Sequence, residues 1–257
     1  MHTAKDIRIA PISAKDANAL VKRVHYSGKV ATTSRLHFGV FLDGRLEGAM
    51  SYGDSIDKRK VISLVRDTHW RGFLELNRLA FTDNLPRNSE SRALSISFKM
   101  IKKNYPHIEW ILSFADGCQC GDGTIYRASG FALTAIKKNS GMWKLPNGDV
   151  VADIITRQVW NESTRKRMGF AMGERWSDYA KRVGATKLPG FQLRYIYFLN
   201  PKARERLTVP IIPFSRIDEM GAGMYRGEKR SKQAMDATSV TAMGQHQSDR
   251  STEASHA

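Results

Sequence analysis

Residues 109–131, EWILSFADGCQCGDGTIYRASGF, decide the fold class of this 257-residue chain. The first part is almost continuously apolar, which is typical of a strand buried on both faces of a sheet. Asp116 ends that run, and GTIYRASGF predicts a short helix closed by Gly130. We therefore expect Asp116 at the carboxyl end of a buried strand, where ligands bind in open α/β sheets. A turn or helix-cap aspartate is the alternative for this residue.

Both cysteines of the chain, Cys118 and Cys120, lie in this same stretch. One residue separates them, so they do not form a C-x-x-C redox motif. The chain also offers no second pair to complete a zinc site. We interpret them as structural or incidental thiols.

Upstream, the sequence predicts a second central strand followed by a long helix. In the strand FLELNRLAF (73–81), simple alternation places Glu75 and Asn77 on one face and Leu76 and Arg78 on the other. A polar loop then leads into an amphipathic helix that begins near Ser89 or Ser91 and stops by Pro106. We expect a mixed α/β fold with a mostly antiparallel sheet, in which 73–81 and 109–115 form one parallel pair.

The N-terminal part of the chain predicts a helix and a hairpin. AKDANALVKRVHY (14–26) has helical apolar spacing, with Ser13 as its N-cap. LHFGVFLDGRLEGAMSYG (36–53) predicts a β-hairpin that turns at Asp43-Gly44. His37 alternates with apolar residues in this hairpin, so we expect it to face solvent.

The C-terminal half carries basic residues interleaved with aromatic ones. Residues 142–160 predict a strand, a turn and a strand, and 174–185 predict an amphipathic helix that contains Trp176 and Tyr179. Such a mixture suits contacts with phosphates and with bases or sugars. An ordinary amphipathic helix with snorkelling arginines is the alternative. The DNA-binding residues predicted here are Arg165, Lys166, Arg167, Arg175 and Arg182.

The chain is strongly basic, with a net charge of +16. Residues 225–257 hold five Lys/Arg and four Asp/Glu, so residues 1–224 carry 36 minus 21, or +15, of that charge. The positive charge therefore belongs to the folded part, which favours a nucleic-acid partner. We expect one catalytic domain over 1–224, followed by a polar, disordered tail over 225–257 that can be deleted without loss of activity.

The predicted order of strand, polar loop, helix, strand and short helix resembles the GNAT acyltransferase fold. In that fold the last of these helices often ends in Y-x-x-x-G-F, here Tyr126 to Phe131, and the central parallel strands splay around the ligand. The usual glycine-rich phosphate loop is replaced by PRNSESRAL (86–94). The candidate cofactor-binding residues of this loop and helix start are Arg87, Asn88, Ser89, Ser91 and Arg92.

Four stretches together resemble the Mom family of phage DNA-modification proteins: HYSGKV (25–30), residues 34–53, ELNRLAF (75–81), and residues 114–131. The resemblance implies an enzyme that converts adenine in phage DNA to N6-carbamoylmethyladenine and so blocks restriction enzymes. By position it implicates five catalytic residues: His25, Tyr26, Arg78, Asp116 and Tyr126. A GNAT-type N-acetyltransferase that acts on a protein or a small-molecule amine is the alternative.

The residue types suit this chemistry. His25 titrates in the right range for a base, and Asp116 offers an acceptor for an N6 proton. Tyr26 and Tyr126 offer stacking surfaces or hydrogen-bond donors, and Arg78 suits a phosphate or carboxylate of the donor. The resemblance also brings in iron, for which His25, Tyr26 and Asp116 form an acceptable ligand set.

Several partners follow from these expectations. The donor candidates are acetyl-CoA, which follows from the fold resemblance, and glycyl-tRNA, which suits a basic domain and a loop without glycines. Double-stranded DNA is the expected acceptor, and tRNA is a second nucleic-acid candidate. The sequence has no apolar run of membrane-spanning length and no signal peptide, so we expect a cytoplasmic protein in an infected host. The oligomeric state, including a dimer, stays open.

Overall fold

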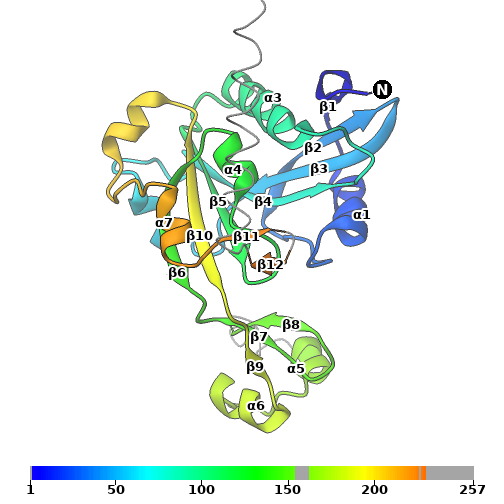
Figure 1. The fold of residues 1–257 in the computed structure, drawn as a ribbon, viewed down its shortest axis with the longest axis vertical. Helices are drawn as coiled ribbons and strands as arrows, with labels where there is room; N and C mark the ends of the chain where they lie inside the picture. The colour runs from blue at the N-terminus through cyan, green and yellow to red at the C-terminus, as the bar shows by residue number, and fades with distance from the viewer. Residues whose placement is uncertain (1, 154–161, 226, 230–257) are drawn as a thin grey trace, which may run out of the picture.

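The computed structural model describes residues 2–153, 162–225 and 227–229. The main sheet is made of β1 (Arg8–Pro11), β2 (Ser34–Leu42), β3 (Arg45–Gly53), β4 (Phe73–Phe81), β5 (Trp110–Gly117), β6 (Ala132–Lys138) and β10 (Phe191–Phe198). The helices around it are η1 (Ala4–Asp6), α1 (Ala14–Val24), α2 (Lys58–Val61), η2 (Ile62–Leu64), α3 (Ser89–Asn104), α4 (Thr124–Ala128), η4 (Pro201–Arg206) and α7 (Ser215–Glu219) (Figure 1).

The main sheet has seven strands in the order β1-β2-β3-β4-β5-β10-β6. Every neighbouring pair is antiparallel except β4 and β5, which are parallel. This pair is hydrogen-bonded only where Phe73–Glu75 faces Trp110–Leu112, although both strands continue well beyond. The sheet is therefore open between the carboxyl halves of β4 and β5, as the resemblance to the GNAT fold implies for the central pair.

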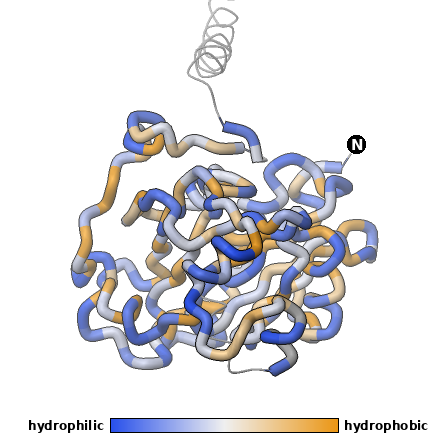
Figure 2. The backbone as a smooth tube through the Cα atoms, turned by 90° about the horizontal axis from the view of Figure 1, so that it is seen from below, coloured by the Kyte–Doolittle hydropathy of each residue, from blue (hydrophilic) through white to orange (hydrophobic). Residues whose placement is uncertain are grey.

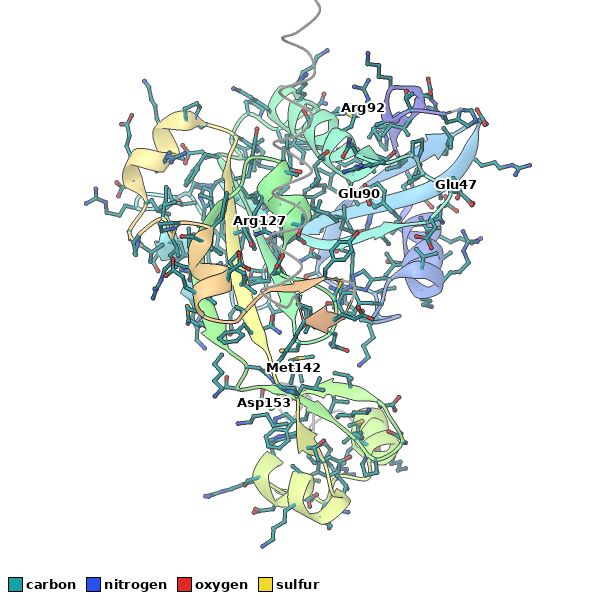
Figure 3. The ribbon with its side chains drawn as sticks, viewed as in Figure 1. Glu47, Glu90, Arg92, Arg127, Met142 and Asp153 are labelled. Atoms are coloured by element: carbon teal, nitrogen blue, oxygen red, sulfur yellow. The ribbon has the colours of Figure 1, made fainter. Side chains whose placement is uncertain are left out.

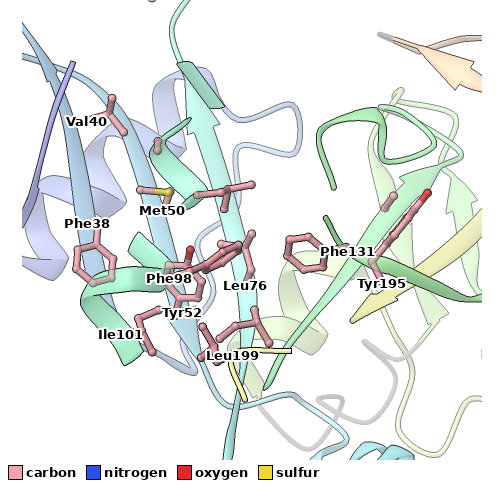
Figure 4. Packing of buried hydrophobic residues seen from close by; sticks show 14 of the residues in the cluster. Phe38, Val40, Met50, Tyr52, Leu76, Phe98, Ile101, Phe131, Tyr195 and Leu199 are labelled. Carbon is pink, nitrogen blue, oxygen red and sulfur yellow. The ribbon is translucent and has the colours of Figure 1, made fainter. Parts of the chain in front are cut away.

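The core lies on both faces of this sheet. On one face α3 packs Leu94, Phe98 and Ile101 against strand residues such as Tyr52 and Leu76 (Figure 4). On the other face α1 packs Ala17 and Leu20 against Ala49 of β3, and a second cluster around Trp110 is closed by η4. Many of the peripheral turns are hydrophilic (Figure 2). None of the helices among the described residues is long and apolar enough to span a bilayer.

A small projecting module lies between β6 and β10. It consists of β7 (Met142–Lys144), β8 (Val150–Ala152), α5 (Glu162–Met168), α6 (Trp176–Val183) and β9 (Thr186–Lys187), with strand order β8-β7-β9. Its own apolar cluster contains Leu145, Val151, Phe170 and Tyr179. Figure 1 shows the module extending away from the main sheet. The strand expected to continue to residue 160 reaches into 154–161, which lie outside the described residues.

Asn139 holds the base of this module. Its side-chain Nδ2 donates to the backbone carbonyls of Met142 and Leu188. Its side-chain Oδ1 accepts from the backbone N–H groups of Gly141 and Met142. The residue is buried. Since these bonds tie together the two chain segments that enter and leave the module, its attachment to the sheet is well defined.

Two expectations about side-chain direction are wrong. His37 is buried, not exposed, because α1 covers its face of β2, and its ring pairs with the Ser51 hydroxyl at 2.9 Å. Leu76 and Arg78 do not share a face. In the β3–β4 ladder Leu76 lies opposite Tyr52 and Arg78 lies opposite Ser51, so Asn77 is an extra, bulged residue. A bulge reverses the alternation beyond it.

Candidate active site

A cleft of about 1000 Å³ occupies the opening between β4 and β5. Walls of the cleft come from both strands, the end of α1, the start of α3, α4 and the base of the projecting module, where Met142 and Asp153 lie (Figure 3). The five side chains expected to be catalytic all line it: His25, Tyr26, Arg78, Asp116 and Tyr126. Residues up to 101 positions apart in the sequence thus converge on one cavity.

Asp116 lies at the carboxyl end of β5, and its carboxylate is held by several donors. Oδ1 accepts from the Cys118 N–H at 3.0 Å and from Gln192 Nε2 at 3.0 Å. Oδ2 accepts from Gln119 Nε2 at 2.7 Å and, more loosely, from the Tyr26 hydroxyl at 3.4 Å. The carboxylate is therefore fixed in orientation, and its Oδ2 contact with Tyr26 is the weakest of the four.

The bulge at Asn77 places Arg78 beside the end of α1. Arg78 Nε donates to the Lys29 carbonyl at 2.6 Å, and Nη1 donates to the Asn77 carbonyl at 2.5 Å. Lys29 in turn donates through Nζ to the Val150 carbonyl of β8 at 2.9 Å. The loop after His25 and Tyr26 is thus tied both to β4 and to the projecting module.

His25 caps the C-terminus of α1 and lies against Tyr26, with ring centroids 4.4 Å apart. Its Nδ1 accepts the Ser27 backbone N–H at 3.2 Å, so the neutral ring carries its proton on Nε2. Burial, with a further contribution from the Arg78 charge, lowers the pKa of His25 to about 4. His25 is therefore neutral at neutral pH, and its Nε2–H group can donate a hydrogen bond into the cleft.

The lowered pKa makes His25 a source of acid instability. The unfolded chain binds a proton near pH 6.5 and the folded chain only near pH 4, so stability falls as the pH drops between these values. Between about pH 7.5 and about pH 5 this one group should cost roughly 2 kcal/mol of unfolding free energy. Urea unfolding of His25→Gln at the two pH values should show a loss smaller by that amount. Equal losses in the two proteins would contradict the burial of a neutral imidazole.

The two tyrosines of the cleft differ in environment. The Tyr26 side chain is 50% exposed, whereas the Tyr126 ring packs against Phe131 and Tyr195 at centroid distances of 5.2 and 5.3 Å. Burial of the hydroxyl raises the pKa of each tyrosine, and the Asp116 carboxylate adds to the rise at Tyr26. Both phenols therefore stay protonated, and Tyr26 is the better stacking surface of the two.

The candidate cofactor residues at the start of α3 divide into two groups. Arg87, Asn88 and Ser91 line the cleft, whereas Ser89 is fully buried and Arg92 is exposed outside the lining. Asn88 is the N-cap and has a φ of 69°, the left-handed conformation that a glycine usually supplies. The loop therefore keeps a glycine-like turn without glycine, because asparagine tolerates this conformation better than most residues.

Glu75 lines the cleft and was not among the residues expected in the site. Burial raises the pKa of its carboxyl, while Arg78 acts in the opposite direction. Glu75 is the last residue of β4 that pairs with β5, and the cleft opens directly beyond it, so only the pairing reveals its place in the site. Cys120 also lines the cleft, and burial and Asp116 raise the pKa of Cys118 to about 11 and also raise that of Cys120, so both thiols stay protonated.

The expected DNA-binding residues all lie on the projecting module. Arg175 is exposed at the N-cap of α6, and Lys166 is exposed in α5, where it pairs with Glu162 at 2.9 Å. Arg165 donates to the Met172 sulfur. Arg182 makes a bidentate ion pair with Glu174, both bonds 2.8 Å, and also reaches the Gly169 carbonyl. The Arg167 side chain lies outside the described part.

The aromatic residues of the module are packing residues. Tyr179 is 2% exposed and stacks on Phe170 at 3.8 Å, and Trp176 lies beside both. The amphipathic-helix alternative therefore holds for Tyr179, because its ring is buried in the apolar cluster of the module. Any DNA contact here has to come from the exposed basic residues.

The side chains suggested as iron ligands, His25, Tyr26 and Asp116, line one cleft, and a metal would have to bind His25 through Nε2, because Nδ1 accepts a hydrogen bond. Both Asp116 oxygens also accept hydrogen bonds, which a metal would have to share or displace. Within residues 2–153, 162–225 and 227–229, no group of three His, Cys, Asp or Glu side chains is placed to hold a metal ion. The positive charge of Arg78 beside His25 disfavours a second cation at this place.

The fold and the cleft define a class: mixed α/β proteins whose site lies between two separated parallel strands. Within that class the chain belongs to the Mom protein family, whose sequence model matches residues 6–216. It is 34% identical over 209 residues to the methylcarbamoylase Mom of Escherichia phage Mu, an alignment that covers 81% of this chain and 82% of that protein. The family resemblance predicted from the four sequence stretches is thereby confirmed.

Two acetyltransferases are among the solved structures that align with this chain. The IAA acetyltransferase from Bacillus cereus aligns with a TM-score of 0.41 and 12% identity, over 75% of this chain and 99% of that one. NAA60 from Arabidopsis thaliana, in complex with a bisubstrate analogue, aligns with a TM-score of 0.43 and 12% identity, over 75% and 97% of the two chains.

Proposed function

We propose that this protein is a DNA-modifying transferase that converts adenine in phage DNA to N6-carbamoylmethyladenine and so protects the DNA from restriction. The observation that carries the proposal is the convergence of His25, Tyr26, Arg78, Asp116 and Tyr126 on one cleft in a member of the Mom family. The name of the phage Mu relative, a methylcarbamoylase, supports the same reaction. The site of action would be the cytoplasm of the infected host.

The acceptor base has to leave the duplex to react. Adenine N6 lies in the major groove of paired DNA, whereas the cleft is enclosed by strands and helices, so the base must be flipped out. The half-exposed Tyr26 ring offers a stacking surface for it. Asp116 Oδ2 accepts an N6 proton in place of its long contact with the Tyr26 hydroxyl.

Group transfer itself requires an activated carbonyl. With glycyl-tRNA, N6 attacks the glycyl carbonyl carbon, a C–N bond forms, and the ester C–O bond to the tRNA breaks. The glycyl amine then attacks C6 of adenine, a new C6–N bond forms and the old C6–N6 bond breaks, so the former N6 becomes the carboxamide nitrogen of the carbamoylmethyl group. With acetyl-CoA the first step breaks the C–S bond and gives N6-acetyladenine, which lacks that nitrogen. The N6 proton passes to Asp116, and the leaving sulfur or oxygen takes up a proton. Tyr126 and His25 Nε2 supply hydrogen bonds to the developing oxyanion, because both groups stay protonated at neutral pH.

The donor candidates remain acetyl-CoA and glycyl-tRNA. A glycyl group and a carbamoylmethyl group are isomers, so a glycyl adduct at N6 contains every atom of the proposed product. Glu90 lines the cleft at the start of α3, where a carboxylate disfavours the diphosphate of coenzyme A. Arg87 and the left-handed Asn88 act in the opposite direction, since they suit an anion.

The experiment that separates these donors uses purified protein and duplex DNA. N6-carbamoylmethyladenine formed with glycyl-tRNA, and absent with acetyl-CoA, would support the aminoacyl donor, whereas N6-acetyladenine formed with acetyl-CoA would support a coenzyme A donor and overturn the carbamoylmethyl product. Acetylation of a peptide or small amine, without any modified adenine, would instead favour the N-acetyltransferase alternative. No product in any arm would leave this chain without transferase activity on the proposed acceptors and would contradict the proposal.

The projecting module should supply much of the affinity for DNA. Reversing the charges of Arg165, Lys166 and Arg167 together should weaken binding to any duplex sequence and reduce the salt dependence of the affinity. Arg182→Ala is a different case, because it breaks the bidentate pair with Glu174 and should destabilise the module as well. Affinity titrations at several salt concentrations measure the slope. An unchanged slope in the triple variant would place the DNA elsewhere.

A further inference from the structure

The last described segment of the chain forms a hairpin on the wall of the cleft. β11 (Met224–Tyr225) pairs with β12 (Glu228–Lys229), and we call these two strands the C-terminal hairpin. The boundary expected at residue 224 passes through this hairpin, so a deletion from residue 225 would remove half of β11 and all of β12 and is no longer expected to be harmless. The family model matches only residues 6–216, so the hairpin lies beyond the matched range.

Main-chain hydrogen bonds anchor the hairpin to the loop after β5. Asp122 N–H donates to the Met224 carbonyl at 3.0 Å, and Gly227 N–H donates to the Cys120 carbonyl at 2.8 Å. The Met224 N–H donates to Asp122 Oδ2 at 3.2 Å, while Oδ1 of the same carboxylate pairs with Arg127 of α4 at 2.9 Å. Asp122 is fully buried and Met224 is 6% exposed. The hairpin is thus part of the folded structure.

Tyr225 differs from Met224 in its exposure. Both residues line the cleft, but the Tyr225 side chain keeps 55% of its surface exposed, close to the 50% of Tyr26. Tyr126 cannot take the role of an open aromatic surface, because its ring packs against Phe131 and Tyr195. Two half-exposed tyrosines therefore border one cavity, Tyr26 from the end of α1 and Tyr225 from the C-terminal hairpin.

We propose that Tyr225 contacts the acceptor base directly and, with Tyr26, forms the aromatic surface that holds it in the cleft. This inference rests on the proposed function and names a residue that determines how the base is bound. Aromatic stacking suits a base whose phosphates are held elsewhere, because it adds affinity without requiring further charge. The C-terminal hairpin then contributes a binding residue to the site from beyond the range that the family model matches.

Equilibrium binding of two single-stranded probes tests the proposal without any donor. One probe is a short oligothymidylate with a single central adenine, and the other carries an abasic site at that position. The wild-type protein should bind the adenine probe more tightly. In Tyr225→Ala and Tyr225→Leu this preference should shrink roughly 5- to 150-fold or vanish, as loss of a stacked base predicts. Binding of the abasic probe should stay at the wild-type level.

Conservative and control variants complete the test. Tyr225→Phe should keep the adenine preference within about twofold, because the ring is retained. Tyr105→Ala, which removes a 40% exposed tyrosine at the end of α3 outside the cleft lining, should change nothing. Preserved adenine preference in Tyr225→Ala or Tyr225→Leu would overturn the inference. A wild-type protein with no adenine preference and no modified adenine would instead be a failure of the proposed function.

Discussion

Asp116→Asn should lower the turnover of DNA modification by about 10²- to 10⁴-fold, which is the usual contribution of a positioned proton acceptor. Asparagine has nearly the same shape, but its NH₂ group cannot accept a proton and its charge is zero. The four donors around the carboxylate come from Cys118 N–H, Gln119, Gln192 and Tyr26. Two of them are amides that can rotate to present oxygen to the new NH₂ group, so the fold should persist.

Turnover and DNA affinity have to be measured separately for this variant. Single-turnover assays with duplex substrate give the rate, and titration gives the affinity, which should stay near the wild-type value. The control is Asp43→Asn at the β2–β3 turn, because Asp43 is exposed and asparagine tolerates its φ of 49°. Wild-type turnover in Asp116→Asn would remove Asp116 from the chemistry.

Gly123→Ala should strongly destabilise the fold, with a loss of about 2–5 kcal/mol of unfolding free energy. Gly123 has a φ of 87°, and a Cβ there would lie 2.5 Å from Cε2 of the buried Tyr195 ring. Tyr195 donates its hydroxyl to the Asp122 carbonyl and packs against Tyr126. The substitution should therefore shift α4, carry Tyr126 away from its position in the cleft and reduce activity as well.

Gly148→Ala is a matched control for that change. Gly148 has nearly the same φ, 89°, but no atom lies within 4 Å of where its Cβ would be. Gly148→Ala should lose only the cost of holding a non-glycine residue in the left-handed conformation, about 1–2 kcal/mol of unfolding free energy. Urea unfolding of both variants isolates the contact with Tyr195. Equal losses in the two proteins would show that the packing of Tyr195 against α4 does not position the site.

The sequence predicted the central strands well because burial leaves a strong signal. The apolar run that ends at Asp116 and the strand 73–81 form the parallel pair, and α3 begins at Ser89 as expected. The bulge at Asn77 was not predictable from alternation, since one extra residue changes no composition and is set by pairing with β3. Because the bulge was not foreseen, alternation assigned Arg78 to the wrong face.

The parts that were missed are short. β9, β11 and β12 have two residues each, too few to show a period of two, whereas the expected strand, turn and strand from residue 142 include β7 and β8. For this reason the sequence did not reveal the separate apolar cluster of the projecting module. Tyr179 was instead grouped with the neighbouring basic residues as a candidate for nucleic-acid contacts. The C-terminal hairpin looked like the start of a polar tail, although main-chain bonds to Cys120 and Asp122 hold it in place.

The most direct test of the central claim is nucleoside mass spectrometry of DNA from cells that express this chain. The account predicts an adenine nucleoside heavier by one carbamoylmethyl group in cells with the wild-type protein, and its near absence in cells with Asp116→Asn at equal protein level. Unmodified adenine in the wild-type sample, with soluble and folded protein present, would contradict the account.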